Sequence, residues 1–241
     1  MESMLRRTFG LTFILLTIYL CWHYMLFGMT MNMEPVSQWQ AHDIVMLYVM
    51  WAVMMAGMML PSALPVLLLV QKFNQRQTQA HHRNVPISVF AAGYLLAWCL
   101  YSVLVTFLQW GLHHFTLLTP MMDSASQVFS AGIVIVAGFY QFSPLKQRCL
   151  QLCRSPMSVV MKGWNNNKLS ALSVGFKHGS YCVLCCWFLM ALLFVGGVMN
   201  ISLIIALTLL VILEKTFPNA KAFSYTVGAA LIIFGIYLLL Q

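Results

Sequence analysis

One apolar stretch of the sequence holds an imidazole, three thiols and a thioether. On a helix, residues three or four apart share a face. The face that begins at His178 continues through Cys182 to Cys185 or Cys186, and Met190 follows four residues after Cys186. Imidazole, thiolate and thioether together form a soft ligand set that favours Cu(I) over harder ions. The spacing therefore predicts a metal site on this helix.

A second apolar run carries four methionines at helical spacing. Met54 and Met58 are four residues apart, and so are Met55 and Met59, so two adjacent helix faces each present a pair of thioethers. Methionine also fills gaps in apolar cores, and the chain contains 18 of them. Taken alone, the methionine cluster is typical of core packing. If it faces the cysteine-rich helix, a metal-binding role is favoured.

A third set consists of two thiols in a basic segment. Cys149 and Cys153 are four residues apart and lie beside Lys146, Arg148 and Arg154. If the segment is helical, both thiols share one face at the cytoplasmic surface and are placed to exchange Cu(I) with a soluble metal carrier. Two reduced thiols in an amphipathic segment are the alternative, and the sequence favours neither.

The composition excludes a soluble globular protein. Of the 241 residues, 61% are hydrophobic and 7% are charged, whereas soluble domains carry roughly 25% charged residues. The net charge of +8 comes from short basic loops and not from a continuous stripe, so we expect no nucleic-acid partner. An odd count of seven cysteines, mostly in apolar runs or a basic loop, argues against an extracellular disulfide framework.

The hydropathy pattern predicts an all-α bundle of about seven transmembrane helices that forms a single domain over residues 1–241. The expected helices cover residues 10–28, 44–71, 86–110, 124–143, 170–198, 201–214 and 222–240. Pro61 and Pro65 favour a kink in the second helix. Basic and non-basic loops alternate, so the positive-inside rule places the N-terminus in the cytoplasm and, after seven passes, the C-terminus outside. A bacterial inner membrane, crossed several times, fits this pattern.

This topology brings the two main ligand sets to one depth. At 1.5 Å per residue, Met54 to Met59 lie roughly 15–23 Å below the outer end of their helix. Cys182 and Cys186 lie roughly 18–24 Å below the same surface. Glu214 and Lys215 close the sixth run, where an ordinary helix-end pair is expected and a charge that neutralises His178 is the alternative.

The types of candidate ligand favour some metals over others. Zinc accepts cysteine and histidine, but neighbouring thioethers favour copper. Haem fits poorly, because histidines are sparse in the apolar runs and the chain has no attachment motif.

Three ordered motifs resemble the bacterial family of predicted metal-binding integral membrane proteins. Trp51-Ala52-Val53-Met54-Met55-Ala56-Gly57-Met58-Met59-Leu60-Pro61-Ser62 is similar to its tryptophan–methionine–proline signature. Tyr140-Gln141 with Pro144-Leu145-Lys146, Cys149-Leu150 and Cys153-Arg154-Ser155-Pro156 is similar to its central motif, and His178-Gly179, Cys182, Cys185-Cys186-Trp187 and Met190 are similar to its third. Gly57 and Leu184 depart from the alanine and glycine expected there. The resemblance implies metal binding in the inner membrane and supplies no reaction.

Three functions remain open at this point. The first is Cu(I) handling, by binding, delivery or transport, with a soluble metal carrier or a second membrane subunit as partner. The second is an oxidoreductase, either copper-dependent or exchanging thiols and disulfides through the C-x-x-C spacing of Cys182 and Cys185. The third is a structural subunit of a membrane complex. The sequence does not decide whether the protein is an enzyme.

Overall fold

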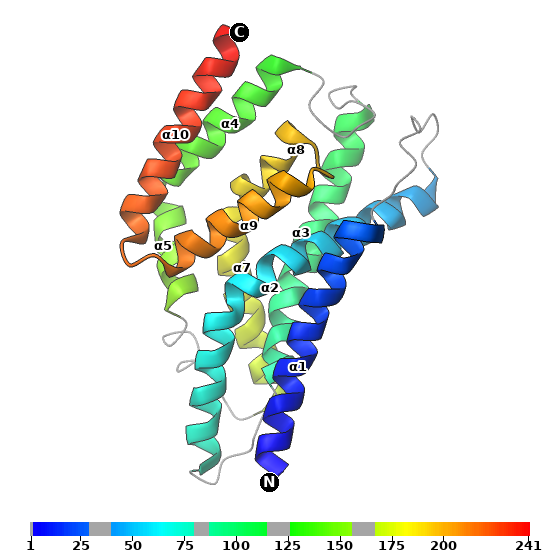
Figure 1. Cartoon of the computed structure of the whole chain (residues 1–241), viewed down its shortest axis with the longest axis vertical. Coiled ribbons are helices and arrows are strands. Elements are labelled where there is room, and N and C mark those ends of the chain that lie inside the picture. The colour runs from blue at the N-terminus through cyan, green and yellow to red at the C-terminus, as the bar shows by residue number, and fades with distance from the viewer. Residues whose placement is uncertain (1, 29–39, 80–86, 115–125, 156–166) are drawn as a thin grey trace.

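The computed structural model describes residues 2–28, 40–79, 87–114, 126–155 and 167–241, and every regular element in these ranges is a helix (Figure 1). In chain order the elements are α1 (Glu2–His23), the π-helical turn η1 (Tyr24–Gly28), α2 (Ala41–Gln79), α3 (Ile87–His114), α4 (Gln127–Gln141), α5 (Pro144–Arg154), α7 (Lys168–Ala191), α8 (Leu193–Gly196), α9 (Ile201–Thr216) and α10 (Ala220–Leu240). The all-α expectation is confirmed for the described residues.

The number of helices able to cross a membrane is lower than the seven expected. Five described segments are long and apolar enough: 10–28, 41–72, 87–114, 168–196 and 220–240. The bent pair of α4 and α5 would make a sixth. Two expected spans fall short of the roughly 20 residues that a span needs. Helix α4 has 15 residues and qualifies only together with α5, and α9 has 16.

A break at Ser143 and Pro144 creates α5 where the sequence analysis expected a loop. Ser143 caps the new helix, because its hydroxyl accepts a hydrogen bond from the Leu145 amide at 3.3 Å. Pro144 occupies the first helical turn, where its missing N–H costs nothing. The chain bends by 65° between α4 and α5. This bend turns the basic cysteine segment back against the bundle.

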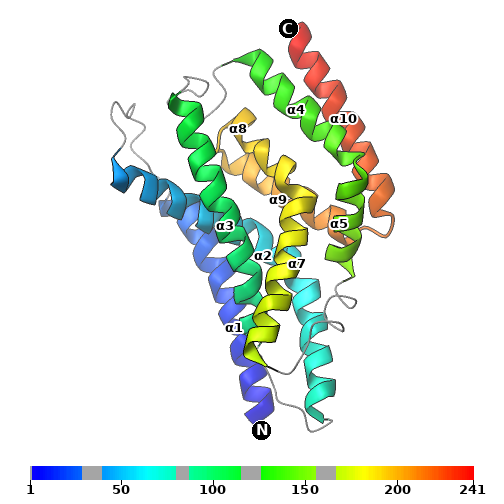
Figure 2. The ribbon, with the colours of Figure 1, turned by 180° about the vertical axis from the view of Figure 1, so that it is seen from behind.

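Close contact between α3 and α7 organises the centre of the molecule. Figure 2 shows the two helices side by side. Gly175 and Gly179 of α7 face α3, and a Cβ at Gly175 would overlap the carbonyl oxygen of Phe90. At Gly179 the added Cβ would lie 2.8 Å from the carbonyl oxygen of Tyr94. Glycines four residues apart let helix backbones touch, which brings Tyr94 against the cysteine-bearing part of α7.

The long helix α2 forms the centre of the core. Its predicted thioether cluster is completely buried: Met54, Met55, Met58 and Met59 are each 0% exposed. Figures 1 and 2 show α2 changing direction midway along its length. Pro61 and Pro65 lie inside this helix, and proline favours a kink. Helix α1 packs on it at Gly57, whose carbonyl oxygen accepts a hydrogen bond from the Trp22 indole at 3.1 Å.

Candidate metal centre

Three thiols from two helices converge in the interior. The sulfur atoms of Cys153, Cys182 and Cys185 all lie within 4.8 Å of one another. None of the three residues is more than 2% exposed. We call this group the three-cysteine cluster. Three sulfur atoms at this separation can ligate one soft metal ion.

Each helix contributes to the three-cysteine cluster through its local geometry. Cys182 and Cys185 are three residues apart on α7 and so share a face. Cys153 lies in the last turn of α5, which reaches α7 because of the 65° bend that precedes α5. The adjacent Arg154 side chain donates a hydrogen bond to the Phe217 carbonyl oxygen at 2.5 Å, which ties the end of α5 to the end of α9.

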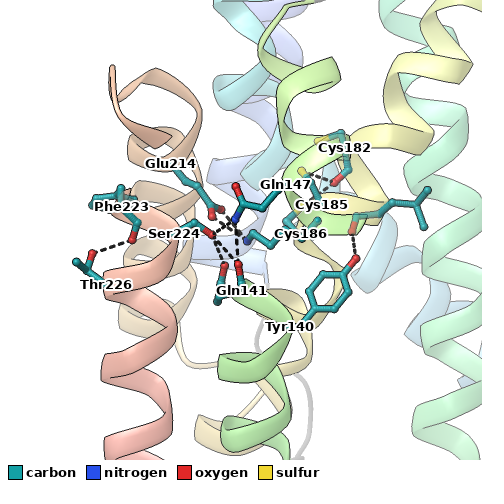
Figure 3. A network of polar contacts seen from close by, with 12 residues as sticks. Tyr140, Gln141, Gln147, Cys182, Cys185, Cys186, Glu214, Phe223, Ser224 and Thr226 are labelled. Carbon is teal, nitrogen blue, oxygen red and sulfur yellow. Dashed lines mark hydrogen bonds and ion pairs between the residues drawn. The ribbon is translucent and has the colours of Figure 1, made fainter. Parts of the chain in front are cut away.

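A tight polar network fixes α5 from its other side. The Lys146 ammonium lies 2.8 and 3.0 Å from the two carboxylate oxygens of Glu214, and both side chains are at most 3% exposed. Nearby, the Ser224 hydroxyl donates to the Gln141 side-chain oxygen at 2.9 Å, and the Gln147 amide donates to the Gln141 carbonyl oxygen at 3.0 Å (Figure 3). The network joins α4, α5, α9 and α10, and so positions Cys153.

This network corrects the sequence-based expectation for Glu214. Neither the helix-end pair with Lys215 nor the neutralisation of His178 is formed, because Glu214 is buried against Lys146. Lys146 looked like a cytoplasmic loop residue, but the break at Pro144 folds it inward. A buried ion pair needs both partners, since either charge alone would carry a large desolvation penalty.

Cys182 is the most heavily contacted of the three thiols. The Lys215 ammonium lies 3.0 Å from its sulfur atom and also donates to the Ser62 hydroxyl at 2.7 Å. The Tyr94 hydroxyl lies 3.1 Å from the same sulfur and 3.3 Å from the Met59 carbonyl oxygen. The cluster therefore has a positive charge and a hydroxyl group beside it.

Tyr94, Ser62 and Lys215 belong to the site but were not predicted from the sequence. The one available signal was Lys215, the sole Lys or Arg in the described helix α9. At the end of an apolar run it resembled an interfacial marker of topology. Only the packing of α9 across α2 and α7 shows that its side chain turns inward.

The remaining residues of the α7 motif lie next to the cluster. The Cys186 and Cys185 thiols donate to the Cys182 carbonyl oxygen at 2.8 and 3.1 Å (Figure 3). Cys186 is buried but is not one of the three sulfurs within 4.8 Å of one another. Met190 is also buried, at 1% exposure. A ligand role for either residue stays a prediction.

His178 lies one turn before Cys182 and is 1% exposed. Its ring packs between those of Phe90 and Tyr94, with both centroid distances at 5.9 Å. The buried Nδ1 atom has no hydrogen-bond partner among the described residues. His178 lies outside the three-cysteine cluster.

The other two predicted ligand sets are placed differently. Cys149 is buried at 5% exposure but does not join the cluster, so the predicted pair of Cys149 and Cys153 is divided. Cys153 joins the thiols of α7, so the second and third motifs contribute to one site. The α2 methionines approach it through Met59, whose carbonyl oxygen shares the Tyr94 hydroxyl with Cys182.

A cavity of about 250 Å³ borders the cluster. We call it the basic cavity; it is lined by Ser62, Ala63, Pro65, Val66, Cys153, Arg154, His178, Lys215 and Thr216. Cys153 is the cluster thiol among these lining residues. The cavity lies where α5 and α9 end, since Arg154 and Thr216 are the last residues of these helices.

Comparison with known proteins identifies one family. The model of the PpoB2 family, described as copper chaperones, matches residues 48–238 of this chain. No curated protein and no solved structure matches it. The matched range includes all three cysteines of the cluster together with Ser62, Tyr94 and Lys215.

Proposed function

Because the chain belongs to the PpoB2 family of copper chaperones, we propose that it binds Cu(I) at the three-cysteine cluster and passes the ion to another molecule. The observation that carries this proposal is the convergence of Cys153, Cys182 and Cys185 within 4.8 Å. Copper is the cargo of such a protein, so the site must both hold the ion and release it.

The donor set fits Cu(I) better than zinc. Structural zinc sites are tetrahedral and need four protein ligands, whereas the cluster offers three thiols. Soft sulfur ligands select Cu(I). Three thiolates around a monovalent ion carry a net charge of about −2, and the Lys215 ammonium at 3.0 Å from Cys182 offsets part of it.

The proposal places this site inside a membrane-embedded bundle. Five long apolar segments support that placement. Burial also argues against thiol–disulfide exchange as the main activity, because exchange requires an accessible thiolate, and both cysteines of the C-x-x-C spacing are at most 1% exposed. The partner that receives or supplies copper, a soluble metal carrier or a second membrane subunit, forms part of the proposal.

The test is elemental analysis of detergent-purified protein after anaerobic loading with Cu(I). We expect about one copper per chain in the wild type, since one group of three soft ligands defines one site. Cys153→Ser, Cys182→Ser and Cys185→Ser should each lose most of it. Cys149→Ser is the matched control, because Cys149 is a buried thiol on the same helix as Cys153 but lies outside the cluster.

Size-exclusion elution and the thermal unfolding midpoint of each variant separate a lost site from a lost fold. Full copper content in a Cys153→Ser/Cys182→Ser double variant would overturn the proposed site. An absence of copper in the wild type, combined with a Cys182–Cys185 disulfide that forms and is reduced reversibly, would favour the oxidoreductase alternative.

A further inference from the structure

The basic cavity carries chemistry that copper binding alone does not use. Two of its lining residues, Arg154 and Lys215, are cationic, and none of the described residues that line it is acidic. Cu(I) itself is a cation, so a cavity with this charge is poorly suited to attract the bare ion. It is suited to an anion that carries the ion.

Its size limits the occupant to a small molecule. Ligand pockets for drug-sized molecules span roughly 300–1,000 Å³, and the basic cavity measures about 250 Å³. This volume cannot admit a folded carrier protein. It is sufficient for a molecule the size of a modified amino acid.

The cavity is also lined by one buried polar atom that lacks a partner. His178 is 1% exposed, lines the cavity, and has a buried Nδ1 atom without a hydrogen-bond partner among the described residues. The hydroxyl groups of Ser62 and Thr216 line the same space, and each already donates to a backbone carbonyl oxygen within its own helix. Buried polar atoms in folded proteins are nearly always satisfied, so an unpaired imidazole nitrogen beside two cations indicates a polar ligand.

We infer that the basic cavity receives Cu(I) as a complex with a small thiol that bears a carboxylate, and that Cys153 is the first protein ligand to bind the ion. This inference rests on the proposed function. Arg154 recognises the carboxylate, because a guanidinium presents a fork of donors that matches it. Cys153 both lines the cavity and belongs to the cluster, so it connects the two.

The transfer is a ligand exchange without a redox step. The Cys153 thiol gives up its proton as its sulfur forms a bond to copper. The bond between copper and the carrier's sulfur breaks, and the carrier leaves as a free thiol with that proton. Copper remains Cu(I). Cys182 and Cys185 then add to the same ion while Cys153 stays bound, and each releases its thiol proton to solvent, so the ion ends in the cluster with three sulfur ligands.

The experiment compares two carriers that differ in one carboxylate. Detergent-purified full-length protein receives Cu(I) from N-acetylcysteine or from N-acetylcysteine amide, and the rate of copper transfer is measured under anaerobic conditions. We expect about five-fold faster transfer from the carboxylate form, the size of effect that one partly exposed ion pair gives. Arg154→Gln should abolish the difference, and Arg154→Lys should retain part of it.

Arg148→Gln is the control, because Arg148 is an exposed arginine on the same helix that does not line the cavity. It should keep the full preference. The same variants are also loaded from a Cu(I)–acetonitrile complex, which needs no thiol carrier. If the protein loads from the acetonitrile complex, and copper transfers at equal rates from N-acetylcysteine and from its amide, the inference is overturned and the proposed function stays intact. Failure to load from any source would overturn both.

Discussion

At the scale of single residues, Lys215 distinguishes this site from an ordinary group of buried cysteines. Its ammonium contacts the Cys182 sulfur at 3.0 Å and the Ser62 hydroxyl at 2.7 Å. Lys215 is half-buried, and a cation drawn into an apolar interior is costly unless something negative lies beside it. A site occupied by thiolates and a monovalent ion supplies that negative charge, so the lysine and the loaded cluster stabilise each other.

Replacement of Lys215 should therefore weaken Cu(I) binding. Lys215→Met removes the charge and keeps the length of the side chain, and a lost contact to a charged group lowers affinity roughly 10- to 100-fold. Competition against a coloured Cu(I) chelator measures the change. Lys221→Met provides the control, since Lys221 is exposed on α10. Equal affinities in the two variants would contradict the role assigned to Lys215.

The sequence could predict that site residues lie together only where they are on the same helix. The i, i+3 spacing of Cys182 and Cys185 is visible in the sequence and persists in the structure. The addition of Cys153 was not predictable, because it depends on a 65° bend between two helices. Lys215 was missed for a related reason, since the direction of its side chain is set by the tertiary packing of α9.

At the scale of helices, the site depends on how closely α3 and α7 approach. The Tyr94 hydroxyl reaches the Cys182 sulfur at 3.1 Å only because Gly175 and Gly179 allow the two backbones to touch. The hydropathy pattern predicted both helices but could not predict which helix each would pack against, because nearly every side of these two helices is apolar.

This contact gives a prediction about α7. Gly175→Ala would place a Cβ on the carbonyl oxygen of Phe90, so α3 and α7 must separate. We expect a loss of roughly 1–3 kcal/mol in unfolding free energy, typical of overpacking, together with weaker Cu(I) retention as Tyr94 moves away. Thermal unfolding and copper analysis measure the two effects.

Gly132→Ala is the matched control for this substitution. Gly132 lies within helix α4, and an added Cβ there meets nothing within 4 Å. Since alanine favours helix by about 1 kcal/mol over glycine, the control should be neutral or stabilising. A similar loss of stability in both variants would mean that α3 and α7 are not in contact at Gly175.

At the scale of the whole molecule, α9 decides the topology. It is too short to span, yet it returns from the end of α8 to the start of α10 within the bundle (Figure 1). Figure 1 shows the N-terminus and the C-terminus at opposite ends of the long axis. If α9 returns the chain to the cytoplasmic side and α10 then crosses outward, the C-terminus lies outside. Seven passes, as expected from the sequence, would place it on the same side.

The C-terminus should accordingly lie outside the cytoplasm. Alkaline phosphatase fused after Gln241 should be active, because the enzyme needs disulfides that form only in an oxidising compartment. A fusion truncated after Lys162, in the basic stretch that the positive-inside rule keeps in the cytoplasm, should be inactive. An inactive phosphatase fusion at Gln241, together with fluorescence from a separate cytoplasmic reporter fused at the same position, would show that α10 ends in the cytoplasm. In that case α9 would not return through the bundle, and Lys215 would not reach Cys182.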